Sequence, residues 1–329
     1  MLHKYTLLKT DAYVSDVVSK INSAKHRVFL SSTTMIADDD NSSAIITSLK
    51  QAAERGLEVS IAADAFTYTE FRNFNFGDLF WSKRARRAKQ LSKEIRESGA
   101  KVHWMGEFSV IAIFGRTHSK WCVVDDTCYT FGGINLDKRS FTNLDYMLRT
   151  KSSELAGELI REHNRMIDAD KSRHPYRSYS FEYGKDKVLV DGGFIGNSII
   201  YKRACQLTKK SKKVTLVSQY CPTGKLSRLL KKTDSKLYFN HWSQADGVNK
   251  WIIRTGMRNS KLVSKYQRVP YLHAKYIIFE LKNGKKVALT GSNNFVYAGV
   301  LIGTREIALE TTNQHLIKQL EGFLAQNVA

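Results

Sequence analysis

The feature that most constrains the fold of this chain is a segment that occurs twice. Within residues 117–135, and again within residues 272–294, a His-x-Lys sequence leads into a short apolar run that an acidic residue closes. In both segments a second strand-like stretch follows and ends in Gly-x-x-Asn. Composition alone does not generate a repeat of this length, so the sequence predicts two related halves that form a pseudo-dimer within one chain.

The repeated motif places an imidazole beside a fixed cation. Residues two apart in an extended strand project to the same face, so the histidine and the lysine of each copy lie together. The ammonium group can hold a phosphate oxygen while the imidazole attacks or donates a proton, and the asparagine amide can donate to the same anion. The pattern therefore indicates phosphoryl chemistry. The candidate catalytic residues are His118, Lys120 and Asn135 in the first copy and His273, Lys275 and Asn294 in the second.

This duplicated motif resembles that of the phospholipase D superfamily, His-x-Lys-x4-Asp followed by Gly-Ser/Gly-x-Asn, and the resemblance covers nearly the whole chain. It implies an enzyme that needs no metal and no cofactor and that forms a phosphohistidine on one of the two histidines. It implies His118 as the nucleophile, although the near symmetry of the two copies leaves this assignment open.

The resemblance also gives roles to four acidic residues. Further along the chain from each motif, Asp145 and Glu306 are expected to accept a hydrogen bond from a motif histidine and to fix its tautomer. The alternative for each is a surface salt bridge. The acids that close the apolar runs, Asp125 and Glu280, are expected to hold the motif lysines or nearby loops, outside the direct chemistry.

Two residues depart from the superfamily pattern. Glu280 stands where most members have Asp and keeps the charge, while Gly133 stands where many have Ser. A Gly-Gly tail is common among members that resemble cardiolipin synthases, and the Tyr-Cys-Pro segment at residues 220–222 also resembles those members. The resemblance favours a phosphatidyltransferase of the cardiolipin synthase type. The alternatives are a phospholipase D hydrolase, a nuclease of the superfamily, and a non-catalytic module that binds membrane or nucleic acid.

The order of the expected elements favours an α/β fold. Helical periodicity over residues 12–24 leads into a strand at residues 27–32, and a helix over residues 41–55 leads into a strand at residues 57–63. Strand, helix, strand implies parallel pairing through crossovers. We therefore expect mixed sheets flanked by helices, with one active site at the interface between the halves.

The second half is expected to repeat this order. A helix over residues 196–209, a basic turn at residues 209–213 and a strand at residues 214–218 correspond to the first helix and strand. The polar stretch around Tyr176 separates the two copies. It predicts an N-terminal half at residues 1–175 and a C-terminal half at residues 176–329.

The charge predicts an anionic partner. The chain has 52 Lys and Arg against 31 Asp and Glu, a net charge of +21. This charge suits an anionic phospholipid surface or a nucleic acid, and it does not distinguish them. In the segment Phe66–Lys89, seven aromatic residues precede five basic ones, a composition that fits an anionic bilayer, stacked bases or ordinary packing on the domain.

The remaining features concern the cellular setting. No apolar run has the length of a membrane span, and the N-terminus lacks a signal peptide, so we expect a cytoplasmic protein whose membrane contact is peripheral. The four cysteines show no metal-binding spacing and are expected to be reduced and buried. We expect a monomer.

Overall fold

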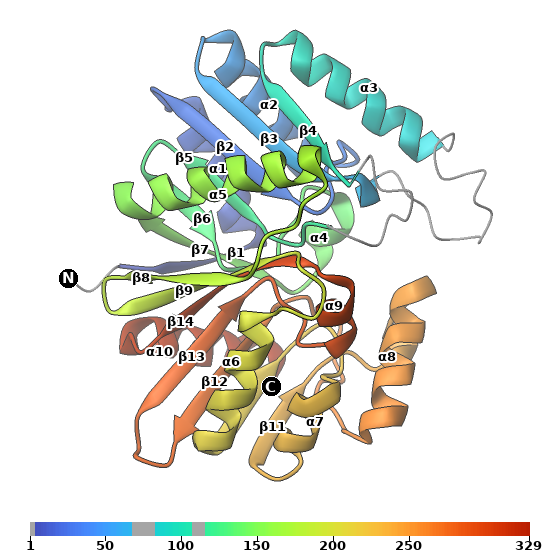
Figure 1. Ribbon diagram of the computed structural model, residues 1–329. Coiled ribbons are helices and arrows are strands. Elements are labelled where there is room, and N and C mark those ends of the chain that lie inside the picture. Colours follow the sequence, from blue (N-terminus) through green and yellow to red (C-terminus); the bar gives the residue numbers. More distant parts are fainter. Residues whose placement is uncertain (1–3, 68–82, 107–115) are drawn as a thin grey trace.

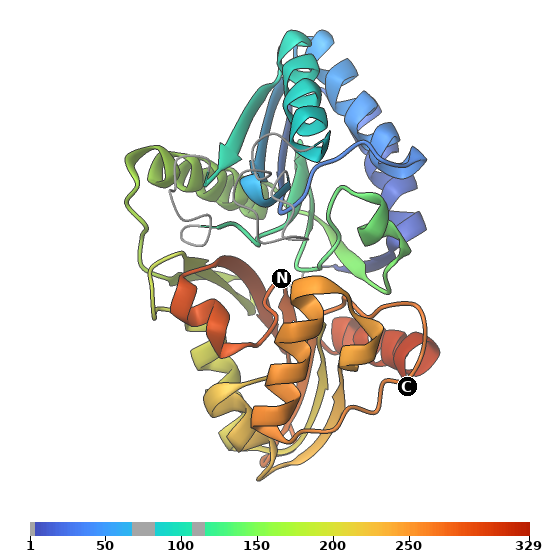
Figure 2. The same ribbon diagram turned by 90° about the vertical axis from the view of Figure 1, so that its right-hand side faces the viewer.

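Two mixed sheets, one in each half of the chain, form the frame of the protein (Figure 1). The computed structural model describes residues 4–67, 83–106 and 116–329. Within these residues each sheet has seven strands and is flanked by helices. The α/β class predicted from the sequence is confirmed. Figure 2, turned by 90°, shows the two halves stacked one above the other.

The first sheet has the strand order β1-β7-β6-β5-β2-β3-β4. β2, β3 and β4 are parallel, and the other neighbours are antiparallel. Its strands are β1 (Thr6–Lys9), β2 (Arg27–Ser32), β3 (Glu58–Asp64), β4 (Lys101–Met105), β5 (Trp121–Val124), β6 (Thr127–Thr130) and β7 (Tyr146–Lys151). The helices of this half are α1 (Thr10–Asn22), α2 (Asp40–Glu54), α3 (Lys83–Glu97), α4 (Lys138–Thr142) and α5 (Ser153–Ser172), with a 3-10 turn at Ala65–Thr67.

The second sheet has the order β11-β10-β12-β13-β14-β9-β8, with β10 and β11 parallel and the other neighbours antiparallel. Its strands are β8 (Tyr179–Tyr183), β9 (Asp186–Gly192), β10 (Ser211–Val217), β11 (Asp234–Tyr238), β12 (Tyr276–Leu281), β13 (Lys286–Gly291) and β14 (Arg305–Thr311). The helices are α6 (Ile199–Lys210), α7 (Gly224–Leu230), α8 (Gly247–Ser260), α9 (Tyr297–Ile302) and α10 (Gln314–Phe323), with a 3-10 turn, η3 (Trp242–Gln244), and a final π turn at Leu324–Val328.

The two sheets repeat one topology. The order β1-β7-β6-β5-β2-β3 in the first sheet matches β9-β14-β13-β12-β10-β11 in the second, and the last pair is parallel in both. β5 and β12, the strands that follow the two His-x-Lys sequences, therefore occupy equivalent central positions. The strands of the first sheet all precede Tyr176 and those of the second all follow it.

Side-chain caps begin several of the helices. The Asp39 carboxylate accepts the Ser42 N–H at the start of α2 (2.9 Å), and Ser152 accepts the Leu155 N–H at the start of α5 (3.2 Å). Each cap satisfies a backbone donor that has no partner within the first helical turn. The basic stretch at residues 209–213, expected as a turn, instead contains the end of α6 and the start of β10. There, Lys213 pairs with Glu280 of β12, so its backbone belongs to the sheet.

The two halves share a hydrophobic core. The ring of Tyr146 in β7 lies 6.0 Å from that of Tyr276 in β12 and 5.2 Å from that of Phe323 in α10. The Tyr146 hydroxyl lies 2.6 Å from Thr290 Oγ1, which in turn donates to the Phe131 carbonyl (2.9 Å). The inner faces of both sheets are thereby fixed against each other.

The aromatic and basic segment Phe66–Lys89 lies only partly within the described structure. Residues 68–82, which contain most of its aromatic residues, are outside the described residues. Its basic part forms the first turns of α3, which begins at Lys83.

Candidate active site

Two short parallel backbone contacts bring the halves together at the motif histidines. Thr117 pairs with Arg305, and Leu144 pairs with Leu272. The backbone N–H of His118 donates to the Arg305 carbonyl (2.8 Å), and that of His273 donates to the Leu144 carbonyl (3.0 Å). Each contact places a His-x-Lys sequence of one half directly beside the segment of the other half that carries the downstream acid.

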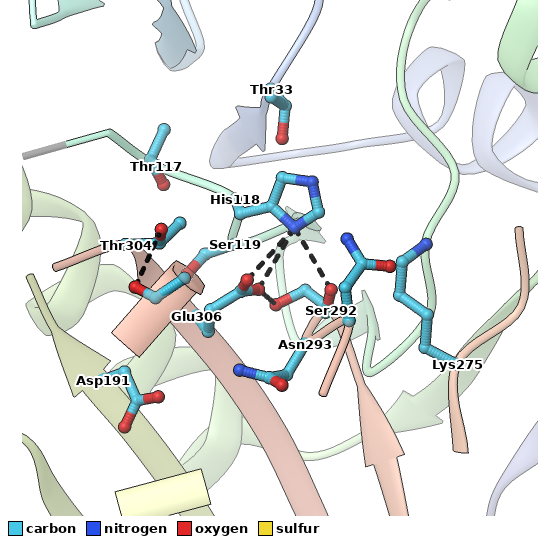
Figure 3. A network of polar contacts seen from close by, with 12 residues as sticks. Thr33, Thr117, His118, Ser119, Asp191, Lys275, Ser292, Asn293, Thr304 and Glu306 are labelled. Atoms are coloured by element: carbon cyan, nitrogen blue, oxygen red, sulfur yellow. Dashed lines mark hydrogen bonds and ion pairs between the residues drawn. The ribbon is translucent and has the colours of Figure 1, made fainter. Parts of the chain in front are cut away.

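The histidine–acid pairs therefore cross between the halves. His273 Nδ1 lies 2.5 Å from Asp145 Oδ2, and His118 Nδ1 lies 3.2 Å from the Glu306 carboxylate. His118 Nδ1 is also 3.1 Å from the Ser292 carbonyl (Figure 3). Because both carboxylates contact Nδ1, the nitrogen that remains for chemistry in each ring is Nε2.

The positively charged surroundings set the charge of the acids. Burial alone would raise the pKa of Asp145, but His273 and Lys275 outweigh burial and hold it below its usual range. Burial likewise opposes ionisation of Glu306, and His118 and Lys120 lower its pKa. Both carboxylates are buried, at 2% and 5% exposure. They are therefore anionic partners of the rings, not surface ion pairs.

The two motif lysines are buried beside the histidines. Lys120 Nζ donates to Thr33 Oγ1 (2.7 Å) and to the His118 carbonyl (2.6 Å), and Lys275 Nζ donates to the His273 carbonyl. Burial, followed by the charge of Lys275, lowers the pKa of Lys120 to about 7, and burial lowers the pKa of Lys275 to about 8. A phosphodiester bound beside the two buried ammonium groups would stabilise their charged forms.

The same surroundings keep the imidazoles neutral. Burial and then Lys275 lower the pKa of His273 to about 4, and burial and then Lys120 lower the pKa of His118. A negatively charged phosphodiester between the rings would oppose both effects, because it stabilises cations. His118 is the more accessible ring, with 21% of its side chain exposed against 8% for His273.

The two asparagines of the motif tails differ in their contacts. Asn135 Oδ1 accepts the Thr33 N–H (3.2 Å), so its amide group is tied to the loop after β2. The Asn294 backbone carbonyl accepts a hydrogen bond from Ser218 Oγ (3.1 Å). Its side-chain Oδ1 is buried and has no hydrogen-bond partner among the described residues. Because an amide oxygen only accepts, a contact of either asparagine with a bound anion would come from its Nδ2 group.

Close packing explains why Gly133 replaces serine. A Cβ atom on Gly133 would overlap Asp145 Oδ2 and lie 2.9 Å from Lys275 Nζ. At the equivalent position of the second copy, Ser292 Oγ donates to the Glu306 carboxylate. The two tails thus support their acids differently: one makes room for the carboxylate and the other binds it.

The acids that close the apolar runs lie away from the lysines. Asp125 accepts the backbone N–H groups of Lys25, His26 and Arg27 at 3.0, 3.0 and 3.1 Å, and so holds the loop before β2. Glu280 forms an ion pair with Lys212 of β10 (2.7 Å). Of the two expected roles, holding a motif lysine or holding a loop, Asp125 has the second, while Glu280 pairs with Lys212 and not with a motif lysine.

Sequence reasoning missed one polar residue at the centre of the site. Thr33 binds both the Lys120 ammonium and the Asn135 amide, yet it lies outside either motif. Thr33 directly follows β2, and it lies in the site because β2 pairs with β5, the strand that follows the first His-x-Lys sequence. No local sequence signal marks it.

The described residues contain no group of three or more His, Cys, Asp or Glu side chains placed to hold a metal ion. No helix among residues 4–67, 83–106 and 116–329 is both long and apolar enough to cross a membrane. The four cysteines are free and buried.

Comparisons with known proteins agree with this geometry. Residues 17–167 match the family model described as "Cardiolipin synthase, PLD-like domain". The fold is similar to that of phosphatidylserine synthase from Haemophilus influenzae, with a TM-score of 0.72, 14% identity, and coverage of 98% of this chain and 85% of that one. It is also similar to polyphosphate kinase from Porphyromonas gingivalis, with a TM-score of 0.61, 13% identity, and coverage of 97% of this chain and 49% of that one.

No curated protein sequence matches the chain. The match of the first half to the family model, the fold shared along the whole chain and the paired motifs agree with one another. The first half of the chain is thus similar to the phospholipase D-like domain of the cardiolipin synthase family model, and the chain as a whole has the fold seen in phosphatidylserine synthase.

Proposed function

We propose that the protein is a phosphatidyltransferase of the cardiolipin synthase type, acting on phospholipid phosphodiesters through a phosphohistidine. The observation that carries the proposal is the crossed pairing of His118 with Glu306 and of His273 with Asp145, beside two buried lysines. This arrangement provides two imidazoles with free Nε2 atoms and two cations for the non-bridging oxygens of one phosphodiester.

The first step forms the phosphohistidine. His118 Nε2 attacks the phosphorus, the bond from phosphorus to the leaving alcohol breaks, and protonated His273 transfers its Nε2 proton to that alcohol. His273 is suited to the acid role because its contact with a carboxylate is the shorter one, 2.5 Å against 3.2 Å for His118. A carboxylate so close stabilises the imidazolium that must form when the phosphodiester binds.

The second step resolves the intermediate. Neutral His273 removes the proton from an acceptor hydroxyl, the hydroxyl oxygen bonds to phosphorus, and the phosphorus–nitrogen bond to His118 breaks. With phosphatidylglycerol as both donor and acceptor, the products are cardiolipin and glycerol. With water as the acceptor the same residues make a hydrolase.

The lysines and asparagines act on the phosphate in both steps. Lys120 and Lys275 neutralise the non-bridging oxygens, and the Nδ2 groups of Asn135 and Asn294 are the amide donors suited to the same anion. Asn135 positions Thr33 and Lys120. The description of the matching family model supports a lipid substrate, and the net charge of +21 equally suits a nuclease of the superfamily.

Product analysis tests the proposal. We expect purified protein to convert phosphatidylglycerol vesicles to cardiolipin and free glycerol, measured by mass spectrometry, and we expect His118→Asn and His273→Asn to abolish both products. A parallel incubation with single-stranded DNA tests the nuclease alternative. Phosphatidic acid without cardiolipin would show that water is the acceptor. Intact lipid with DNA cut only by the wild-type protein would exclude a lipid substrate and retain the site.

A further inference from the structure

One surface of the second half combines exposed apolar side chains with exposed cations. It comprises Val248, Lys250, Trp251 and Arg254 of α8, and Arg268 and Val269 of the loop that follows this helix; we call it the α8 face. Figure 2 shows α8 toward the viewer in the lower half of the molecule. Trp251 is 67% exposed and Val269 is 90% exposed, so both present most of their surface to solvent.

The turn η3 joins the helix and the loop into one surface. Trp242 of this turn lies beneath two cations of α8, with its ring centre 5.6 Å from Lys250 Nζ and 5.5 Å from Arg254 Cζ. Gln244 of the same turn donates to the Arg268 carbonyl (2.8 Å). The cations therefore hold a fixed arrangement around one ring, and the exposed Trp251 and Val269 lie on the two segments that this turn connects.

The charge of this region has one sign. From Gly247 to Phe279 the sequence contains no Asp and no Glu, although it contains seven Lys and Arg residues. Asp246 directly precedes this stretch and Glu280 directly follows it, and one of its seven cations, Lys275, is buried in the active site while the other six lie outside that site. Such a surface attracts anions at a distance and, through its apolar side chains, gains from burial on contact.

The α8 face also lies close to the active site. Val269 is four positions before the catalytic His273, a span of at most about 14 Å even in a fully extended chain. The hydroxyl of Tyr220, which follows directly after Gln219, donates to Asn249 of α8 (2.5 Å). Gln219 Nε2 in turn lies 3.4 Å from the hydroxyl of Tyr271, two residues before His273. A partner bound to the α8 face therefore lies close to the active site.

We propose that the α8 face docks the protein on an anionic phospholipid bilayer, with Trp251 and Val269 entering the interface and Lys250, Arg254 and Arg268 contacting lipid phosphates. The choice of a lipid occupant rests on the proposed function. Two features of the face favour a bilayer over a nucleic acid: aliphatic valines have no role in base stacking, and apolar side chains alternating with cations match a headgroup layer above acyl chains.

Vesicle binding tests the docking surface directly. The variants are Lys250→Gln/Arg254→Gln/Arg268→Gln and Trp251→Ser/Val269→Ser. The matched control is Lys20→Gln/Lys151→Gln/Lys171→Gln, which also removes three positive charges, but from exposed positions in the first half. Binding to phosphatidylcholine vesicles with a rising fraction of phosphatidylglycerol is measured by co-sedimentation, all in the His118→Asn background so that turnover does not change the lipid. Circular dichroism verifies that each variant is folded.

The triple α8-face variant is expected to bind about 100-fold more weakly, because each Lys or Arg near an anionic surface contributes about 1 kcal/mol. The apolar variant is expected to bind about tenfold more weakly, and the control nearly as well as the protein it derives from. In the active background, turnover of short-chain phosphatidylglycerol below its micelle concentration should be unaffected by the α8-face changes, while turnover of vesicles falls.

The outcomes separate docking from chemistry. Binding that does not increase with phosphatidylglycerol, or that weakens equally in the control, would overturn the docking proposal. Weaker binding of single-stranded DNA with unchanged vesicle binding would also overturn it and identify a nucleic-acid surface. Vesicle binding lost specifically in the α8-face variants supports docking even if product analysis finds no lipid product, in which case the proposed function alone fails.

Discussion

At the scale of single residues, the site depends on one missing side chain. Gly133 lies against the Asp145 carboxylate, which contacts His273 at 2.5 Å, and against Lys275 Nζ. A methyl group at this position has no free volume and would have to displace the acid or the lysine. The absence of a side chain thus sets the geometry of a histidine in the other half of the molecule.

We expect Gly133→Ala to lower kcat roughly tenfold to 100-fold, because displacements near 1 Å in a catalytic constellation have effects of this size. Steady-state kinetics with phosphatidylglycerol measures the change. Gly157→Ala is the matched control, since a Cβ there meets no atom closer than 3.7 Å within α5. That control should retain kcat and raise stability by about 0.5–1 kcal/mol. Equal kcat values for the two variants would contradict the packing argument.

At the scale of elements, one buried side chain anchors the segment before His273. Asn240, in the loop after β11, is fully buried and bonds both backbone groups of Leu272. Its Nδ2 donates to the Leu272 carbonyl (2.7 Å) and to the Gln219 carbonyl (2.9 Å), and its Oδ1 accepts the Leu272 N–H (2.9 Å). The Asn240 side chain therefore makes, with the backbone next to His273, the hydrogen bonds that a neighbouring strand would otherwise make.

Asn240→Asp should break this anchor, because a carboxylate oxygen would face two carbonyl oxygens in a buried place. We expect the free energy of unfolding to fall by about 2–4 kcal/mol, the range for buried polar groups left unpaired, and kcat to fall with it. Chemical denaturation and steady-state kinetics measure the two effects. Asn22→Asp makes the same change at an exposed position of α1 and should alter stability by less than about 0.5 kcal/mol. Full stability of Asn240→Asp would show that the anchor is dispensable.

At the scale of the whole molecule, the site exists only where both halves meet. Lys120 comes from the first half and Lys275 from the second, and their charges repel across the interface, lowering the pKa of Lys120 in addition to the effect of burial. Each histidine takes its carboxylate from the opposite half. The charge balance of the site is thus a property of the assembled chain.

This balance predicts how anion binding depends on pH. Lysines with pKa values of about 7 and 8 lose their protons as the pH rises through this range, so the affinity for a phosphodiester anion should fall there. Calorimetric titration with dimethyl phosphate, whose own charge is constant over this range, measures the effect. A constant affinity would contradict the buried lysine charges, and Lys120→Met should reduce the pH dependence.

The lowered pKa values of the two lysines also make the free energy of unfolding depend on pH. The unfolded chain keeps both lysines protonated up to a pKa of about 10.4, whereas the folded chain releases the protons at lower pH. Between these values the unfolded state binds more protons, so these two groups make the folded state relatively more stable as the pH rises from about 7 to about 10. Binding and stability therefore change in opposite directions with pH.

The sequence by itself determined the candidate site residues and the place of the central strands. The His-x-Lys spacing and the apolar runs after it encode which side chains share a face, and the structure forms β5 and β12 at those runs. Strand and helix order predicted the α/β class for the same reason: hydrophobic periodicity is a local property. The sequence also identified Asp145 and Glu306 as the acids for the histidines, though not which acid serves which ring.

Only the tertiary structure decided which side chains contact one another in the site. Asp145 and His273 are 128 positions apart, and Glu306 and His118 are 188 apart, so no local spacing could indicate that the pairs cross. Thr33 joins the site through the pairing of β2 with β5, and Gly133 is required because a carboxylate occupies the space of its side chain. Periodicity tells which way a side chain faces, but hydrogen-bond partners across an interface are fixed only when the two surfaces pack.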